Sequence, residues 1–386
     1  MKKLLFTALT ALFAVSMTLS VGNASVQANA AEITTVGKAA YLCDFASGTQ
    51  VYARKAEKHL PIASMCKIMT LLLSFEAVDN GALSYDEMIT VSENASAMGG
   101  SQVYLDAGLS YCAGDLIKTV AVCSANDSCV ALAERIAGSE SDFVAKMNAR
   151  AKELGAENTL FANCTGLPKE PQYSCAKDVA TMLRALLTHE KYFEFSKVWY
   201  EDFPHPDGRT ISITNTNKLI RRYTGCDGGK TGFTSEAGFC LAATAKRGDT
   251  RLISVIIGAD SSENRFEGIT AMFDYCFNCY ETRVVLEAGK PLEEKVSVRC
   301  SQTKEISIVA ETPLTAFAKR GETGDYQVTL ELCKDLKAPL KQGDEVGNAT
   351  LFHEGVEIGR TKLLAGEDAL KLRWWDAFRE TAQNWQ

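Results

Sequence analysis

The sequence predicts a mixed α/β (α+β) domain, a small all-β domain and a C-terminal amphipathic helix, in that order. Strand-like runs enclose a helix-rich stretch between residues 31 and 281, a pattern produced by a sheet covered with helices. From 283 to 365 the chain consists of short alternating runs and turns with almost no helical period. From 367 to 386 the apolar residues fall on one broad helical face.

Residues 1–30 have the features of a cleaved secretory signal peptide. Lys2 and Lys3 give a positive start, an apolar run follows, and Ala28-Asn29-Ala30 offers the small residues after which a signal peptidase cuts. The apolar run also approaches the length of a short spanning helix, so a retained membrane anchor is the alternative. We therefore expect an exported protein.

In the first domain, alternation and β-branched residues predict the strands, while apolar residues repeating every three or four positions predict the helices. Gly81, Gly138 and Gly155 end three of the helices, and Ser174 is expected to cap another. The predicted strands are 39–45, 50–53, 88–91, 210–214, 239–246 and 250–258. The predicted helices are 64–80, 115–123, 127–138, 142–154, 174–188 and 262–280.

Composition argues against a nucleic-acid partner, a disulfide framework and a metal site. The formal net charge of −7 argues against a nucleic-acid partner. The thirteen cysteines are odd in number and irregular in spacing, so we expect most of them to be free thiols that pack as small apolar residues. Cys276 and Cys279 form a C-x-x-C pair, but there is no second pair and the four histidines are scattered. We expect no metal and no cofactor.

The first candidate site lies between Pro61 and Thr70. Ser64 and Lys67 stand three residues apart where a helical apolar run begins, so their side chains share one face of the predicted helix. A serine hydroxyl becomes a strong nucleophile when a base takes its proton, and a lysine is able to be that base. The plain alternative is a capping serine followed by a solvated lysine.

Two further motifs stand later in the domain. Ser124-Ala125-Asn126 interrupts two predicted helices, and Lys230-Thr231-Gly232 lies on a strand beside a glycine-rich turn. Alone, the first is a turn or helix cap and the second an exposed strand end. Together with the Ser64-x-x-Lys67 pair they form the serine acyl-enzyme signature of penicillin-binding proteins and class A β-lactamases.

The chain resembles the serine-type D-Ala-D-Ala carboxypeptidases of peptidase family S11, the low-molecular-mass penicillin-binding proteins, over nearly its whole length. The resemblance implies a serine β-lactamase/penicillin-binding-protein-like catalytic domain. It also implies removal of the terminal D-Ala from peptidoglycan pentapeptide stems, with β-lactam antibiotics as covalent inhibitors. The matching stretches are Pro61–Thr70, Ser124–Gly138, Asn163–Pro168, Asp227–Leu241 and Ala338–Gly347.

The same resemblance assigns roles to residues of the three motifs. Ser64 attacks the carbonyl of the penultimate D-Ala, Lys67 is the base, and Ser124 relays a proton to the leaving amine. The backbone amides of Ser64 and Phe233 form the oxyanion hole. The substrate-binding residues are Asn126, Lys230, Thr231, Gly232 and Phe233.

The sequence departs from the family pattern at three places. Cys66 and Cys175 stand where the family usually has threonine, and at helix offset i+2 Cys66 should face away from Ser64. Thr216 stands where the family commonly uses an arginine to help hold the substrate carboxylate, with Arg221 and Arg222 nearby. Carboxylate recognition is therefore the part of the resemblance that fits least well.

The C-terminal helix is expected to bind the outer face of the cytoplasmic membrane. Three of the four tryptophans, Trp374, Trp375 and Trp385, lie in it, and a short helix with a large aromatic face is typical of a membrane-surface anchor. Packing of this face against the β domain is the alternative. With the signal peptide, the helix predicts a location at the extracytoplasmic membrane face or in the cell wall.

Two other functions compete with a carboxypeptidase. A serine β-lactamase shares the nucleophile and the base, but class A enzymes have an E-x-x-L-N pattern after the second motif, whereas here Glu170 is followed by Pro171. The additional β domain also fits a free lactamase poorly. A non-catalytic wall-binding protein would not need the complete set of three motifs.

Overall fold

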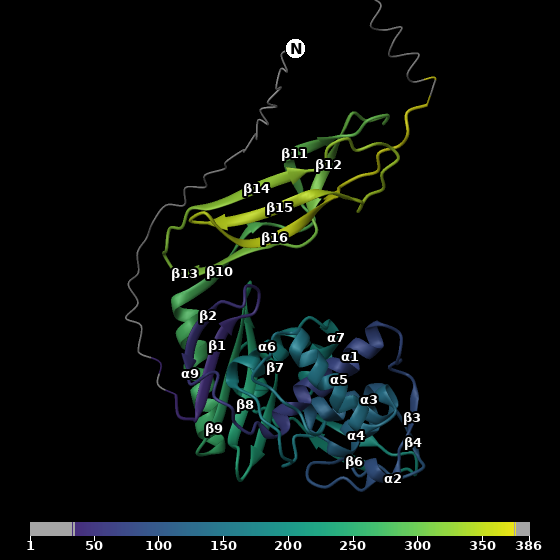
Figure 1. Ribbon diagram of the computed structural model, residues 1–386, viewed down its shortest axis with the longest axis vertical. Coiled ribbons are helices and arrows are strands. Elements are labelled where there is room, and N and C mark those ends of the chain that lie inside the picture. The colour runs from purple at the N-terminus through teal and green to yellow at the C-terminus, as the bar shows by residue number, and fades with distance from the viewer. Residues whose placement is uncertain (1–32, 34, 374, 376–386) are drawn as a thin grey trace, which may run out of the picture. The chain divides into compact units, whose positions relative to one another are not determined.

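The computed structural model describes residues 33, 35–373 and 375, and Figure 1 shows the elements of this part of the chain. It forms two compact units, which meet in the sequence between Tyr280 and Glu281. The predicted signal peptide, 1–30, lies outside the described residues. So do residues 374 and 376–386 of the predicted C-terminal helix.

The first unit is built on a five-stranded antiparallel sheet with the order β2-β1-β9-β8-β7 (Figure 1). The N-terminal hairpin therefore completes a sheet whose other strands begin only at Cys226. Its central strands are buried on both faces, as their apolar and β-branched composition predicts. The strands are β1 (Ala39–Asp44), β2 (Gln50–Arg54), β7 (Cys226–Thr234), β8 (Gly238–Arg247) and β9 (Thr250–Ala259).

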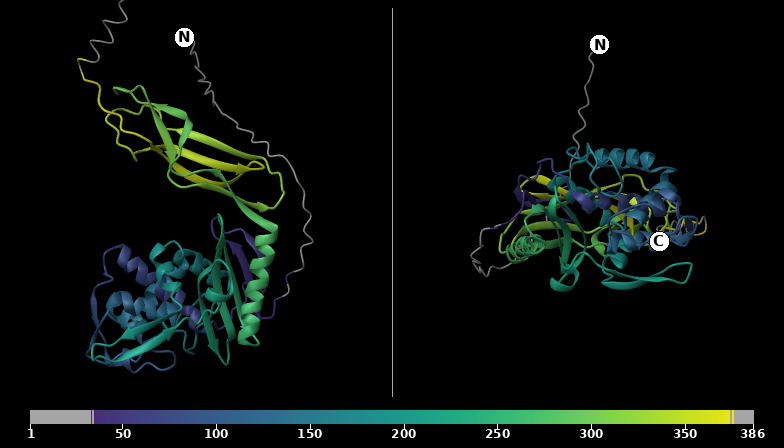
Figure 2. Two further views of the ribbon diagram at one scale, coloured as in Figure 1. Left: turned by 180° about the vertical axis from the view of Figure 1, so that it is seen from behind. Right: turned by 90° about the horizontal axis from the view of Figure 1, so that it is seen from below.

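Helices cover both faces of this sheet. The helix α9 packs on β8 and β9 from one side, and α6 packs on β1 and β9 from the other, as the view from behind also shows (Figure 2). The longer helices are α1 (Lys67–Asp79), α3 (Ala113–Val122), α4 (Asn126–Ala137), α5 (Glu140–Glu153), α6 (Ala176–Leu186) and α9 (Ser262–Cys279). The shorter ones are α2 (Glu93–Ser96), α7 (Glu190–Ser196) and α8 (Leu219–Arg222). Two small two-stranded antiparallel sheets pair β3 (Met88–Thr90) with β4 (Ser110–Cys112) and β5 (Tyr200–Pro204) with β6 (Thr210–Thr214).

Two predicted helix starts are wrong. Ser64 does not open an α-helix, because Ala63–Cys66 form a short 3-10 turn, η1, and α1 begins at Lys67. Ser174 does not cap α6; the cap is Cys175, whose Sγ accepts a hydrogen bond from the Asp178 amide at 3.4 Å. A thiol thus takes the place that a hydroxyl usually has at this position of a helix.

The second unit is all β, which confirms the prediction for this part of the chain. One sheet has the order β11-β12-β16-β15-β14 and a second pairs β10 with β13. Buried aliphatic side chains such as Ile306, Leu351 and Leu363 form its core. The strands are β10 (Tyr280–Leu286), β11 (Pro291–Ser297), β12 (Glu305–Ala310), β13 (Leu314–Lys319), β14 (Tyr326–Leu332), β15 (Glu345–His353) and β16 (Val356–Ala365).

The predicted C-terminal helix does not begin at residue 367. Residues 367–373 are extended, and Ala369 and Lys371 form isolated bridges with Leu340 and Ser301. These backbone bonds attach the segment to the β unit and exclude a helical conformation there. No helix in the described part of the chain is long and apolar enough to span a bilayer.

None of the thirteen cysteines forms a disulfide in the structure. Several are fully buried, among them Cys66, Cys129 and Cys164. Burial raises the pKa of the Cys129 thiol to about 12, so this group is a protonated packing residue at neutral pH.

Candidate active site

Ser64 and Lys67 are in direct contact, as their spacing predicts. Lys67 Nζ donates a hydrogen bond to Ser64 Oγ at 3.1 Å and a second to the Thr165 carbonyl at 2.5 Å. The Lys67 side chain is fully buried, whereas Ser64 remains partly exposed. A buried amine beside a partly exposed hydroxyl is the arrangement that a nucleophile and its base require.

Two glycines allow other segments to approach the nucleophile. A Cβ atom on Gly166 would lie 2.1 Å from the Ala63 carbonyl oxygen, and one on Gly232 would lie 2.6 Å from that of Ile62. The same position on Gly232 is 3.2 Å from the Ser64 amide nitrogen. The third motif and the loop around Gly166 thus lie against the turn that carries Ser64, at distances no larger residue permits.

The loop that reaches Lys67 is held by Asn163. Its Oδ1 accepts from the Gly166 amide at 2.7 Å and from the Thr165 amide at 3.2 Å, while its Nδ2 donates to the Leu167 carbonyl at 2.7 Å. These bonds fix the Thr165 carbonyl against Lys67. In the sequence, Asn163–Pro168 is a stretch that matches the family, but no role was predicted for its residues.

Ser124 lies in the break between α3 and α4, Asn126 is the first residue of α4, and both are buried. Ser124 has φ +68, a left-handed conformation that serine adopts only when its surroundings impose it. Asn126 Nδ2 donates to the Gly99 carbonyl at 2.6 Å, and the Asn126 amide donates to the Ser101 carbonyl at 2.7 Å. Within the described chain, Ser124 Oγ and Asn126 Oδ1 have no hydrogen-bond partner, so both can bond a ligand.

A proton relay through Ser124 would link this residue to Lys67, but among the described residues Ser124 Oγ has no hydrogen-bond partner. The two residues nevertheless belong to segments that pack together, because α1 contacts α4. A relay through Ser124 therefore stays a prediction.

Lys230 brings a second amine into the same buried region. It is 1% exposed on β7, and its Nζ donates to the Thr231 carbonyl at 3.2 Å. Burial, followed by the charge of Lys67, lowers the pKa of Lys230 to about 7. Because like charges in a buried site repel each other, the two lysines disfavour a doubly protonated state.

The other third-motif residues lie along the same strand. Thr231 and Gly232 are buried, and Phe233 is 55% exposed with its ring 4.4 Å from that of Phe239. The strand thus presents a buried cation and then an exposed aromatic side chain.

The departures from the family pattern have distinct structural outcomes. Cys66 is buried, and its Sγ donates to the Asn163 carbonyl at 3.3 Å, a bond that a threonine hydroxyl is also able to make. Burial raises the pKa of this thiol, which keeps it protonated. Arg222 pairs with Glu263 at 3.0 Å, and the Arg221 guanidinium lies 4.8 Å from the Trp199 ring. Both arginines therefore have partners outside the three motifs.

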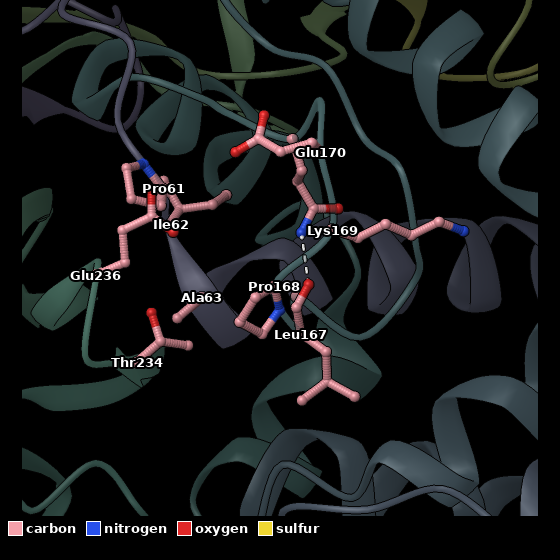
Figure 3. A pocket seen from close by; sticks show the side chains of 11 residues that line it. Pro61, Ile62, Ala63, Leu167, Pro168, Lys169, Glu170, Thr234 and Glu236 are labelled. Carbon is pink, nitrogen blue, oxygen red and sulfur yellow. Dashed lines mark hydrogen bonds between the residues drawn. The ribbon is translucent and has the colours of Figure 1, made fainter.

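A pocket adjoins the nucleophile turn on the side of Ala63 (Figure 3). Thr234 and Glu236 line it after the third motif, and Pro168 and Glu170 line it from the loop that follows Gly166. Figure 3 shows the Glu170 carboxylate directed away from Ala63 and Pro168. Glu170 is an exposed residue of this pocket lining.

The family model described as D-alanyl-D-alanine carboxypeptidase matches residues 24–261. The chain belongs to peptidase family S11. The model of the penicillin-binding protein 5 C-terminal domain matches residues 280–371, which confirms a catalytic domain of this family followed by an all-β domain.

Relatives of this chain match from about two thirds of its length to the whole of it. The D-alanyl-D-alanine carboxypeptidase DacF of Bacillus subtilis is 36% identical over 387 residues, covering 100% of this chain and 99% of that protein. Penicillin-binding protein 5 of Haemophilus influenzae is 28% identical with a TM-score of 0.68, covering 88% of this chain and 99% of that one. Penicillin-binding protein D2 of Listeria monocytogenes, solved in its ampicillin-bound form, is 32% identical with a TM-score of 0.57. The match covers 64% of this chain and 100% of that one.

Proposed function

We propose that this protein is a penicillin-sensitive D-alanyl-D-alanine carboxypeptidase that removes the terminal D-Ala from peptidoglycan pentapeptide stems through an acyl-enzyme at Ser64. The observation that carries the proposal is the bond between buried Lys67 Nζ and Ser64 Oγ, with a second buried lysine on β7. Membership of a family named for this activity supports it.

Acylation starts from the 3.1 Å hydrogen bond between Ser64 and Lys67. A neutral Lys67 takes the hydroxyl proton while Ser64 Oγ forms a bond to the carbonyl carbon of the penultimate D-Ala. The amide bond then breaks, and Ser124 passes a proton to the leaving amine of the terminal D-Ala.

The negative charge that develops on the carbonyl oxygen is stabilised by the amides of Ser64 and Phe233. The close approach of Gly232 to the Ser64 amide, measured above, supports the pairing of these two donors. Water then hydrolyses the acyl-enzyme, with Lys67 again acting as the base.

Substrate recognition is assigned to the third motif and to Asn126. A protonated Lys230 attracts the C-terminal carboxylate of the substrate, and Thr231 supplies a hydroxyl to it. Asn126 Oδ1, which has no hydrogen-bond partner among residues 35–373, accepts a backbone amide of the peptide. Gly232 and Phe233 continue strand β7, the edge strand of the sheet, along which the substrate peptide lies.

The protein acts outside the cytoplasm, where peptidoglycan lies. We propose that residues 1–30 direct its export, that 31–281 form the catalytic domain and that 283–365 form the β domain. We also propose that the segment after residue 373 contacts the outer face of the cytoplasmic membrane through its tryptophans. Deleting residues 374–386 tests the last point, since a variant that still sediments with membranes would exclude it.

The catalytic proposal is tested by incubating the purified protein with a pentapeptide ending in D-Ala-D-Ala and, separately, with fluorescent penicillin. We expect release of D-Ala and a stable penicillin label on Ser64, both absent in Ser64→Ala. Rapid penicillin turnover without peptide cleavage would favour a lactamase. No labelling at all would favour a binding protein.

A further inference from the structure

A buried arginine lies directly behind the third motif. Arg265 is 9% exposed, and its guanidinium lies 4.8 Å from the Phe266 ring and 5.5 Å from the Phe239 ring. The described residues provide it with no acidic partner, although burying a cation without one is costly. Burial lowers the pKa of Arg265 accordingly.

Arg265 donates its hydrogen bonds mainly to carbonyl oxygens of the sheet. Its Nη1 donates to the carbonyls of Gly232 and Cys240, both at 3.2 Å, and its Nη2 donates to Ser262 Oγ at 3.2 Å. Gly232 and Cys240 are directly paired across β7 and β8. The guanidinium therefore spans the two strands at the level of the third motif.

The carbonyl of Gly232 and the amide of Phe233 belong to one planar peptide group. A cationic donor on the carbonyl oxygen draws electron density from the group, which makes the N–H at its other end a stronger donor. The same bond fixes the plane of the peptide, and therefore the direction in which that N–H points.

We propose that Arg265 is a positioning residue, which orients and polarises the Gly232–Phe233 peptide so that the Phe233 amide stabilises the oxyanion formed at Ser64. The inference rests on the proposed function, because it needs an acyl-transfer reaction at Ser64. Arg265 does not touch the substrate; it acts through the peptide group alone.

A purely structural role is the alternative, and the same unit contains an arginine that illustrates it. Arg251 binds Asp227 through two bonds of 2.7 and 2.8 Å, and its guanidinium lies 4.4 Å from the Phe193 ring. Arg251 thus also links strands and packs on an aromatic ring, but its charge is neutralised and it does not contact the third motif. It is the matched control for Arg265.

The test compares Arg265→Gln, Arg265→Lys and the control Arg251→Gln. For each we would measure the acylation rate constant with fluorescent penicillin, the dissociation constant of the preceding noncovalent complex and the inhibition constant of a boronic acid. A boronic acid forms a tetrahedral anion on Ser64 and therefore reports on the oxyanion hole. Thermal unfolding reports on the fold.

We expect Arg265→Gln to slow acylation about 10- to 100-fold, a fraction of the effect of deleting an oxyanion donor. Boronic acid affinity should fall by a similar factor, while the noncovalent dissociation constant changes less than about twofold. Arg265→Lys, which keeps a cationic donor, should recover part of the loss. Arg251→Gln should lower the unfolding temperature but leave acylation nearly unchanged.

The inference is overturned if Arg265→Gln acylates like the wild type, or if acylation and noncovalent binding weaken equally. Should Arg265→Gln fail to fold, Arg265→Lys decides the matter, because we expect it to recover only part of the function; acylation and boronic acid affinity that both equal those of the wild type would overturn the inference. A wild-type protein that penicillin does not label would instead refute the proposed function, so the two failures are distinguishable.

Discussion

Replacing Lys230 with methionine is expected to stabilise the protein below neutral pH while removing its activity. Lys230 is 1% exposed, and burial together with the charge of Lys67 lowers its pKa from 10.5 to about 7. Below pH 7 the native protein must therefore hold a buried ammonium whose proton it binds weakly, whereas the unfolded chain holds the same charge in water. Methionine fills a similar volume without that penalty.

The size of the effect follows from the difference between the two pKa values. Each tenfold change in proton affinity is worth about 1.4 kcal/mol, so lowering the pKa from 10.5 to about 7 costs the native state about 5 kcal/mol at acidic pH. Loss of the 3.2 Å bond to the Thr231 carbonyl subtracts about 1 kcal/mol. We expect Lys230→Met to be more stable than the wild type by about 3–4 kcal/mol at pH 6.

The sign of the pH dependence is fixed by which state holds the proton. Between pH 7 and 10.5 the unfolded chain keeps a proton that the native Lys230 has released, so the stability of the wild type rises with pH. The methionine variant lacks this group. Its advantage should therefore be largest below pH 7 and vanish near pH 10, where only the loss of the hydrogen bond to the Thr231 carbonyl remains.

Urea unfolding at pH 6, 8 and 10 measures this difference, and penicillin labelling at the same pH values measures the activity. Lys118→Met is the control, because Lys118 is paired with Glu201 at 2.6 Å and its pKa is raised. That variant should be slightly less stable than the wild type. A Lys230→Met protein that is less stable at pH 6, or whose difference does not change with pH, would refute the reasoning.

Three further changes test individual contacts. Cys66→Thr should keep the rate of penicillin labelling within about twofold, since the hydroxyl replaces the thiol on the Asn163 carbonyl; a large loss would show an unexplained role for the thiol. Gly166→Ala should lower the labelling rate and destabilise the protein by about 1–3 kcal/mol in urea unfolding, because a Cβ there would lie 2.1 Å from the Ala63 carbonyl oxygen. An unchanged labelling rate and an unchanged stability would contradict that close packing. Tyr192→Phe removes the hydroxyl that accepts a hydrogen bond from the Gly229 amide at 2.9 Å. It should lower the free energy of unfolding by about 1–3 kcal/mol in the same assay, with little change in noncovalent penicillin binding. A variant as stable as the wild type would mean that this bond makes no net contribution to stability.

The pairing of Ser64 with Lys67 was predictable because it depends only on local helical geometry. Side chains three residues apart meet on a 3-10 turn as well as on an α-helix. The contact was therefore predicted correctly although Ser64 lies on a 3-10 turn and not on the predicted α-helix. The place of Lys230 in the same site was predicted from the family resemblance. The sequence separation between Lys67 and Lys230 does not by itself predict it. The apolar and β-branched content of β8 and β9 predicted central strands, because strands that are buried on both faces need apolar residues at nearly every position.

Other features depend on contacts between distant segments and leave no pattern in the sequence. The carbonyl of Thr165 reaches Lys67 only because Gly166 permits the loop to touch the nucleophile turn. Arg265 looks like any arginine on an amphipathic helix until its bond to Gly232 is seen. The apolar residues of 367–373 fit the predicted helical face, but backbone pairing of Ala369 with Leu340 holds this segment out of a helix.

The central claim is that Ser64 is the nucleophile of a carboxypeptidase, and trapping the acyl-enzyme tests it most directly. Mass spectrometry of the protein after incubation with penicillin should find one penicilloyl group on the peptide that contains Ser64. The same preparation should release D-Ala from a pentapeptide ending in D-Ala-D-Ala, with both signals lost in Ser64→Ala. An adduct on another residue, or peptide cleavage that persists in Ser64→Ala, would contradict the account.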